Sequence, residues 1–283
     1  MNKGIVKVYF TKGFGNNLFQ YCFAKILAEK NLMKMNHPPI PELGILEKNN
    51  KFTKNLKLKK IKITSKRKHL YDSDCKKYLK KNLSKYNVYL FGYFEDYTIY
   101  KPYLKEIRSW FPNIKKTNTK DLVLHLRLRN RLVQENHFKN FVPPENYKHA
   151  IEEFNFERLY IVSDEPKWES VDEDYITSLR KKYPPTTNGY VPIKDSVDYM
   201  NNLVEAFKEY NPILKHNNNF IDDFNFIRSF DKILLNNSTF SWWAAVLSHA
   251  SKIGVFRPWK KNKGKIRNKN LGETDYPGWF SWE

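Results

Sequence analysis

Short apolar runs alternate with segments of helical character along most of this chain. The first run, Ile5 to Phe10, leads through a glycine-containing turn, Thr11 to Asn17, into Leu18 to Ala28, which has the composition of a helix. Strand, glycine turn and helix form the opening of a βαβ unit. Further along, Tyr86 to Phe94 predicts a strand and Tyr97 to Trp110 predicts a helix.

The second half of the chain repeats this alternation more regularly. Apolar positions recur at helical spacing from Val197 to Phe207 and again from Trp242 to Ala250. Five short runs predict strands: Leu122 to Leu126, Leu159 to Val162, Asn219 to Ile221, Lys232 to Asn236 and Ile253 to Phe256. Strands that alternate with helices favour a parallel sheet with helices on both faces.

A boundary between two domains is predicted near residue 118. Phe111-Pro112 precedes a polar stretch, Asn113 to Lys120, and such a stretch is typical of a linker. We expect an α/β domain over residues 1–118, with a Lys/Asn-rich insert near 47–85 whose structure the pattern leaves open. A second, Rossmann-like domain is expected over residues 119–283. Two such α/β halves that face each other across a cleft form a GT-B-like architecture.

The positive charge of the chain is concentrated in two segments. Lys48 to Lys85 contains fifteen Lys and Arg against two acids, and Arg257 to Lys269 contains seven against none. Their net charges of +13 and +7 add up to the formal charge of +20 for the whole chain, so the rest of the chain is close to neutral. A basic surface favours anionic partners such as nucleic acid, anionic lipid headgroups or phosphorylated substrates. A solvated lysine face explains the same composition, so charge alone assigns no function, and no nucleic acid is expected.

Three features indicate the compartment. Only Cys22 and Cys75 are present, which is too few for a disulfide framework or a cysteine metal site. The longest apolar runs fall far short of the roughly 20 residues that span a bilayer. Met1 leads directly into the first strand without the apolar core of a secretion signal. We expect a cytoplasmic protein, with any contact to anionic lipid being peripheral and at the inner membrane face.

The first candidate site is Gly13-Phe14-Gly15-Asn16-Asn17, at the turn from the first strand into its helix. Glycine allows close backbone approach, and N–H groups at a helix start attract phosphate or a sugar hydroxyl. Because Leu18 stands where a third glycine would complete GxGxxG, a tight turn without a ligand explains the pattern equally well.

The second candidate follows the strand Leu122 to Leu126, which ends in His125 and the guanidinium groups of Arg127, Arg129 and Arg131. Ligands of open α/β sheets bind beyond the carboxyl ends of the strands, so a cation there lies where a diphosphate would bind. Arginine suits that role because its planar fork pairs bidentately with phosphate oxygens. The alternative is an exposed arginine loop beside a core histidine.

Two further candidates lie at strand ends. Asp223 precedes the strand that leads into Asn237, Ser238 and Thr239, where hydroxyl and amide donors open a helix. Ser238 and Thr239 also suit helix N-caps, and the tryptophan pair that follows them favours core packing over a stacking platform. Asp164 follows the strand Leu159 to Val162, where it is either a site residue or a turn residue.

The order and content of these motifs resemble the α-1,2-fucosyltransferase family, glycosyltransferase family 11, within the GDP-fucose-dependent fucosyltransferase superfamily. NSTFSWWAA is the most specific of the motifs, and together they cover most of the chain except the basic insert and the tail. The matching segments are Gly13 to Ala24, Phe91 to Asp96, His125 to Arg127, Glu145 to Ile151, Ser163 to Trp168 and Asn237 to Ala245.

The resemblance implies an inverting GT-B hexosyltransferase without a metal or other cofactor. It would transfer fucose from GDP-fucose to a glycan acceptor, at the 2-hydroxyl of a galactose-like residue. Carried over, Arg127 stabilises the departing GDP, where negative charge grows in the transition state. His125 and Asp223 hold the guanine, and Ser238 and Thr239, with Asn237, bind the diphosphate. Asn16, beside Gly15, faces the fucose or the acceptor from the other domain.

The chain departs from the family pattern HxRxGD in one loop. Arg129 stands in place of the glycine and Asn130 in place of the aspartate, while Leu128 occupies a position that is usually arginine. No general base is assigned, and the candidates are Asp164, Glu135 and His137. Two alternatives stay open: a GT-B transferase that uses another nucleotide sugar, and a degenerate, non-catalytic protein that binds nucleotides or other anions.

Overall fold

The computed structural model describes residues 4–49, 58–65, 73–96, 99–139, 141–165, 168–185, 189–215, 219–236, 238–256, 261–262, 265–266 and 279–282. The chain forms two compact units, residues 1–113 and 114–283. Each unit is built on a parallel sheet, so the prediction of an α/β chain is confirmed.

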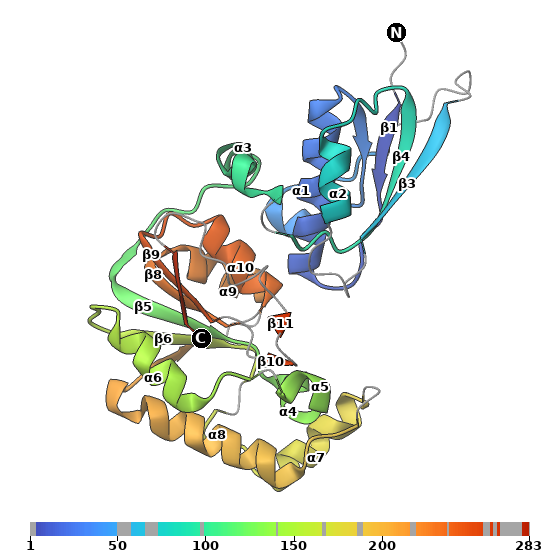
Figure 1. Cartoon of the computed structure of the whole chain (residues 1–283). Helices are drawn as coiled ribbons and strands as arrows, with labels where there is room; N and C mark the ends of the chain where they lie inside the picture. Colours follow the sequence, from blue (N-terminus) through green and yellow to red (C-terminus); the bar gives the residue numbers. More distant parts are fainter. Residues whose placement is uncertain are drawn as a thin grey trace. The chain divides into compact units, whose positions relative to one another are not determined.

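The first unit contains a four-stranded parallel sheet in the order β2-β1-β4-β3 (Figure 1). Its strands are β1 (Ile5–Val8), β2 (Lys34–Asn36), β3 (Lys59–Ser65) and β4 (Tyr86–Gly92). The strands predicted from Ile5 and from Tyr86 are therefore confirmed. β3 arises within the basic insert, for which the sequence pattern predicted no element.

The helices of the first unit are α1 (Phe14–Lys30), α2 (Ser73–Leu79) and α3 (Leu104–Ser109), with 3-10 turns at Pro41–Leu43 and Lys101–Tyr103. The helix predicted over Tyr97 to Trp110 is too long: α3 accounts for its later part, and a 3-10 turn that contains Pro102 precedes α3. Proline cannot donate the backbone hydrogen bond of a helix interior, so it lies at the start.

The second unit contains a six-stranded parallel sheet in the order β12-β9-β8-β5-β6-β7. Its strands are β5 (Asn118–Leu126), β6 (Leu159–Ser163), β7 (Ile213–Lys215), β8 (Phe230–Leu235), β9 (Lys252–Phe256) and β12 (Trp279–Trp282). A separate antiparallel pair joins β10 (Lys261–Asn262) to β11 (Lys265–Ile266). β5 is central, with Leu122, Leu124 and Leu126 fully buried.

Helices cover both faces of this sheet, as predicted: α9 and α10 lie on one face and α6 and α8 on the other (Figure 1). The helices are α4 (Arg129–Val133), α5 (Glu135–Phe138), α6 (Pro144–Glu152), α7 (Glu173–Lys182), α8 (Ile193–Phe207), α9 (Phe220–Arg228) and α10 (Thr239–Val246), with a 3-10 turn at Lys208–Tyr210. Within the described ranges, no helix combines the length and apolar character that a bilayer span requires.

One predicted strand is wrong. Asn219 to Ile221 does not extend the sheet but begins α9, because the Asn219 side chain accepts a hydrogen bond from the Ile221 N–H at 3.0 Å and caps the helix. The strand in this part of the chain is β7, a few residues earlier.

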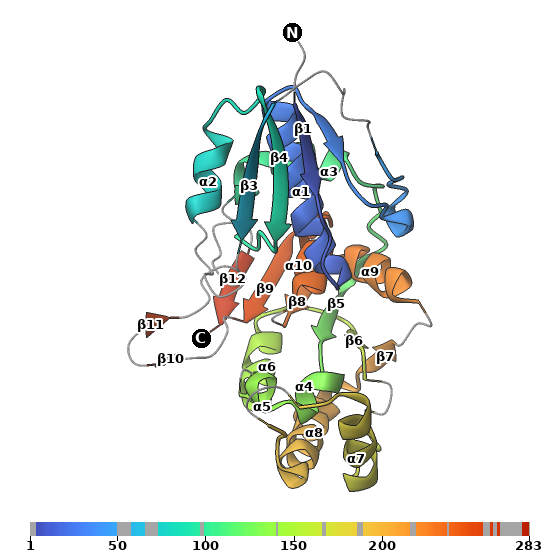
Figure 2. The same ribbon diagram turned by 90° about the vertical axis from the view of Figure 1, so that its right-hand side faces the viewer.

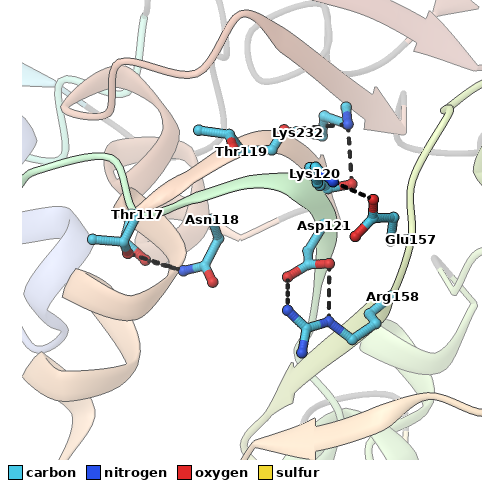
Figure 3. A network of polar contacts seen from close by, with 9 residues as sticks. Thr117, Asn118, Thr119, Lys120, Asp121, Glu157, Arg158 and Lys232 are labelled. Atoms are coloured by element: carbon cyan, nitrogen blue, oxygen red, sulfur yellow. Dashed lines mark hydrogen bonds and ion pairs between the residues drawn. The ribbon is translucent and has the colours of Figure 1, made fainter.

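A polar network fastens the amino-terminal end of β5 (Figure 3). Arg158 donates to both carboxylate oxygens of the buried Asp121, at 3.1 and 2.9 Å. Lys120 pairs with Glu157 at 2.8 Å, and Lys232 donates to backbone carbonyls of β5. This network links β5 to β6 and β8 near the amino-terminal ends of the strands.

Candidate functional site

The carboxyl ends of β5 and β8 mark the topological switch point of the six-stranded sheet. From β5 the chain proceeds outward to β6 and β7, then returns to place β8 on the other side of β5. His125 lies opposite both Val162 of β6 and Leu235 of β8. Open α/β sheets bind ligands in the crevice at such a point. Most of the candidate residues of the second unit follow the ends of β5, β6 and β8.

Arg127 is held by two side chains immediately after β5. Its guanidinium forms an ion pair with one carboxylate oxygen of Asp164, and it also donates to Asn130 Oδ1 at 3.1 Å. The other carboxylate oxygen of Asp164 accepts the Leu128 N–H at 2.7 Å. The Arg127 side chain nevertheless remains 41% exposed, so a fixed cation is accessible to an anionic ligand.

The departure from the HxRxGD pattern has a structural consequence in this loop. Asn130 still accepts a hydrogen bond from Arg127, and its amide donates to Gln134 Oε1 at 3.1 Å. The carboxylate that orients Arg127 comes from Asp164, on the neighbouring strand. Leu128 is fully buried, whereas Arg129 is half-buried as the first residue of α4.

The position of Arg129 is reflected in the electrostatics of Tyr175. Burial and a 2.6 Å hydrogen bond to Glu165 raise the pKa of Tyr175, and the positive charge of Arg129 opposes that rise. Arg129 therefore lies near the Tyr175–Glu165 pair.

His125 is a buried, neutral histidine whose Nδ1 has no hydrogen-bond partner among the described residues. Burial is the main cause that lowers its pKa to about 3, and the charges of Arg127 and Arg131 add to the effect. Buried polar atoms are normally hydrogen-bonded, so an unpaired, buried imidazole nitrogen near the end of β5 is an exception. Its ring lies 5.4 Å from that of Phe240.

The ring of Phe240 connects His125 to the helix that carries Asp223. Phe240, in the first turn of α10, packs against Phe224 of α9 with ring centroids 5.3 Å apart. Asp223 is half-buried beside Phe224 in α9. The structure thus brings β5, α9 and α10 together around one aromatic cluster.

Ser238 and Thr239 lie at the start of α10. Ser238 occupies the N-cap position, but its side chain makes no capping hydrogen bond, and the residue is 7% exposed. Thr239 is the first residue of the helix, and Asn237 lies outside the described residues. Trp242 and Trp243 are buried and meet edge to face at 5.0 Å, which confirms the expectation of core packing.

Gly15 and Asn16 lie on α1 in the first unit, whereas all other candidates belong to the second. Gly13 precedes the helix with a φ of 102°, a conformation that favours glycine. Asn16 donates to the Lys12 carbonyl at 3.0 Å. Gly15 is buried in the first turn.

Sequence reasoning singled out the glycine turn but missed the residue that fixes it. The buried Gln20 accepts the Thr11 N–H at 3.1 Å and donates to the Thr11 hydroxyl at 3.1 Å and to the Gly92 carbonyl at 2.5 Å. It therefore ties together the carboxyl ends of β1 and β4. A glutamine among the apolar positions of a helix was the available signal.

Glu135 and His137 lie on the short helix α5. The Glu135 carboxylate forms an ion pair with Lys139 one helical turn later. Both oxygens of Asp164 are engaged, one with the Arg127 guanidinium and the other with the Leu128 N–H.

No known family profile matches this chain, and no curated protein is a significant match. Solved structures that match this chain include an arginine-to-lysine mutant of Arabidopsis thaliana FUT1 in complex with GDP, at 9% identity and a TM-score of 0.44, over 92% of this chain and 72% of the other. POFUT1 in complex with GDP has 12% identity and a TM-score of 0.41, over 90% and 98% of the two chains. POFUT1 in complex with GDP-fucose has 12% identity and a TM-score of 0.37, over 88% and 96%. At these TM-scores the likeness assigns no activity.

Proposed function

We propose that this protein is a fucosyltransferase that transfers fucose from GDP-fucose to a glycan hydroxyl, with inversion and without a metal. The observation that carries the proposal is the Arg127 guanidinium, which Asp164 and Asn130 hold, partly exposed, at the switch point of the second unit. The resemblance of the surrounding motifs to α-1,2-fucosyltransferases supports GDP-fucose as donor and the 2-hydroxyl of a galactose-like residue as acceptor.

In this proposal Arg127 binds the β-phosphate. The bond between the sugar C1 and the phosphate oxygen breaks, and GDP leaves with the electron pair. Arg127 stabilises the charge that develops on that oxygen, and its preorganisation by Asp164 lowers the cost of reorganisation. The acceptor oxygen attacks C1 from the opposite face and gives its proton to a base, for which Glu135 and His137 remain candidates. Asp164 acts through Arg127 and not as the base.

The nucleotide contacts are part of the same proposal. The unpaired Nδ1 of His125 and the carboxylate of Asp223 are proposed to recognise the guanine, whose ring N–H and amino group are donors that suit a carboxylate. The Ser238 hydroxyl makes no capping hydrogen bond to α10. With Thr239 and Asn237, it would contact the diphosphate at the start of that helix. The first unit is proposed to bind the acceptor, with Gly15 and Asn16 contacting the acceptor or the fucose.

A donor screen tests the proposal. Purified protein is mixed with GDP-fucose, GDP-mannose and several UDP- and dTDP-sugars in the presence of EDTA, and nucleotide release and thermal shift are followed. Among these donors, only GDP-fucose should stabilise the protein. At a concentration 100 times its Kd, the free energy of unfolding should rise by about 2.7 kcal/mol. Arg127→Lys keeps the charge but loses the bidentate fork, so it should weaken the response, and Arg127→Ala should abolish it.

Arg158→Lys is the matched control, because Arg158 also pairs with an aspartate but lies at the amino edge of the sheet. It should leave the donor response unchanged. A response only to another nucleotide sugar would move the protein to a different donor class. A thermal shift without nucleotide release would favour a non-catalytic nucleotide-binding protein, and no response to any of them would favour a protein that binds other anions. With a galactose-terminated acceptor, NMR of the product should show the inverted anomer.

A further inference from the structure

Helices cover one face of the four-stranded sheet of the first unit. The other face, which we call the open face, is covered only in part, because Ile5 and Asn36 are buried there whereas the lysines of β2 and β3 on that side are exposed. Val6, Val8, Ile63, Val88 and Leu90 are buried on the side where α1 and α2 pack. Figure 2 looks onto the opposite face, with β1, β3 and β4 in front of α1. Parallel sheets are normally covered on both faces, so an open face needs an explanation.

Strand alternation places lysines on this open face. Lys7 lies opposite Asn36 and Tyr89, and Lys62 lies opposite Tyr89 from the other side, so Lys7 and Lys62 project to the same side of the sheet. Lys60 and Lys34 share that side by the same alternation. None of these four lysines forms an ion pair within the described ranges, and no acid occurs in β1, β3 or β4.

Two aromatic rings hold part of this lysine array in place. Tyr9 and Phe91 stack with centroids 4.7 Å apart and an interplanar angle of 10°. Lys7 lies over the Tyr9 ring at 5.0 Å, and Lys62 lies over the Phe91 ring at 4.8 Å. Each ring therefore contacts both its aromatic neighbour and a lysine ammonium.

This arrangement distinguishes between classes of anionic partner. Proteins that bind single-stranded nucleic acid offer free aromatic faces on which bases stack. Here Tyr9 and Phe91 already stack on each other and carry lysine ammonium groups near their rings, which makes these two rings poor platforms for a base. The lysines extend across three strand spacings, or about 14 Å, on an open sheet face. Such an array complements a plane of negative charges.

We propose that the open face, defined by Lys7, Lys34, Lys60 and Lys62, docks on the headgroups of an anionic lipid bilayer. Each lysine close to an anionic lipid surface is expected to raise the affinity of the protein for that surface about five-fold. This contact goes beyond the proposed transfer reaction and does not depend on it, because it uses the sheet of the first unit and no donor residue.

Vesicle sedimentation of the whole protein tests the proposal. Vesicles of equal parts phosphatidylcholine and phosphatidylglycerol should bind the protein, whereas vesicles of phosphatidylcholine alone should not. Lys60→Gln with Lys62→Gln should weaken binding roughly 25-fold, since two lysines are removed. Both side chains are exposed on the edge strand β3, so the fold should persist, which thermal denaturation checks.

Lys80→Gln with Lys81→Gln is the matched control, since it makes the same charge change just after α2, the helix on the covered side. It should leave vesicle binding within about two-fold of wild type, because its lysines lie away from the open face. Equal losses in the two double variants would overturn the proposal, as would the absence of vesicle binding. A loss confined to binding of single-stranded RNA would assign the face to nucleic acid instead. Lys7→Gln, on a central strand, gives an independent check and should weaken vesicle binding about five-fold.

Discussion

The carboxylate of Asp164, just beyond β6, forms an ion pair with the guanidinium of Arg127, just beyond β5. The second oxygen of the same carboxylate accepts the N–H of Leu128, the residue after the arginine. One side chain thus fixes both the backbone of the loop and the cation that the loop presents. Because these contacts use both oxygens, we propose that Asp164 positions Arg127.

Replacement of Asp164 by Asn should separate positioning from folding. The amide keeps an acceptor for Leu128 but removes the negative charge that faces Arg127. We expect kcat/KM for GDP-fucose to fall by up to about 100-fold, since a misplaced catalytic group has an effect of that size. Steady-state kinetics and thermal melting measure the two effects. Asp172→Asn is the control, because Asp172 caps α7 and asparagine caps equally well. An unchanged kcat/KM in Asp164→Asn would contradict the positioning role.

Asn130→Asp tests whether the changed loop still supports Arg127. Asn130 accepts a hydrogen bond from Arg127, and a carboxylate would accept it as a stronger, charge-assisted bond. We expect the donor-induced thermal shift to be kept or increased, while Asn130→Ala should reduce it. If the aspartate abolished the shift and the alanine left it intact, Asn130 would have no part in holding the arginine.

The buried His125 predicts a pH dependence of stability. Its folded pKa of about 3 lies below the ordinary value of 6.5, mainly because of burial. As the pH falls from about 6.5 toward 3, the unfolded chain takes up a proton that the folded chain excludes, so this contribution to stability is lost. The loss approaches about 1.4 kcal/mol per pH unit.

Urea denaturation of wild type and His125→Gln at several pH values measures the effect of this one group. Glutamine does not titrate, so the stability of wild type relative to the variant should decline as the pH falls. A difference that stays constant from neutral to acidic pH would show that His125 titrates alike in both states.

Gln20→Leu should destabilise the first unit. The leucine fills a similar volume but leaves the Thr11 N–H and the Gly92 carbonyl without their partner. An unsatisfied buried group costs about 1–3 kcal/mol, and chemical denaturation measures the loss. Asn16→Ala is the comparison, because it removes an exposed bond to the Lys12 carbonyl and should cost less than about 1 kcal/mol. Equal losses would mean that the Gln20 bonds contribute no more than the exposed one.

The sequence alone predicted the elements whose signals are local. Apolar runs predicted β5, β6, β8 and β9, because strands that are buried on both faces of a parallel sheet require such runs. Apolar positions at helical spacing predicted α8. It failed at Asn219, whose side chain accepts a hydrogen bond from the Ile221 N–H and so caps a helix where a strand was predicted. It was silent on β3, whose lysine-rich strand has an open face and so needs few apolar residues.

The candidate residues of the second unit were visible in the sequence, but their relationships were not. Arg127 and Asp164 lie 37 positions apart, and only the parallel pairing of β5 with β6 places their side chains together. The same holds for His125, whose ring lies beside Phe240 of α10. Burial lowers its pKa, and the charges of Arg127 and Arg131 lower it further. Sequence determined which groups are present and where strands end. Tertiary structure decided which groups meet, because hydrogen bonds and desolvation depend on distances that chain order does not specify.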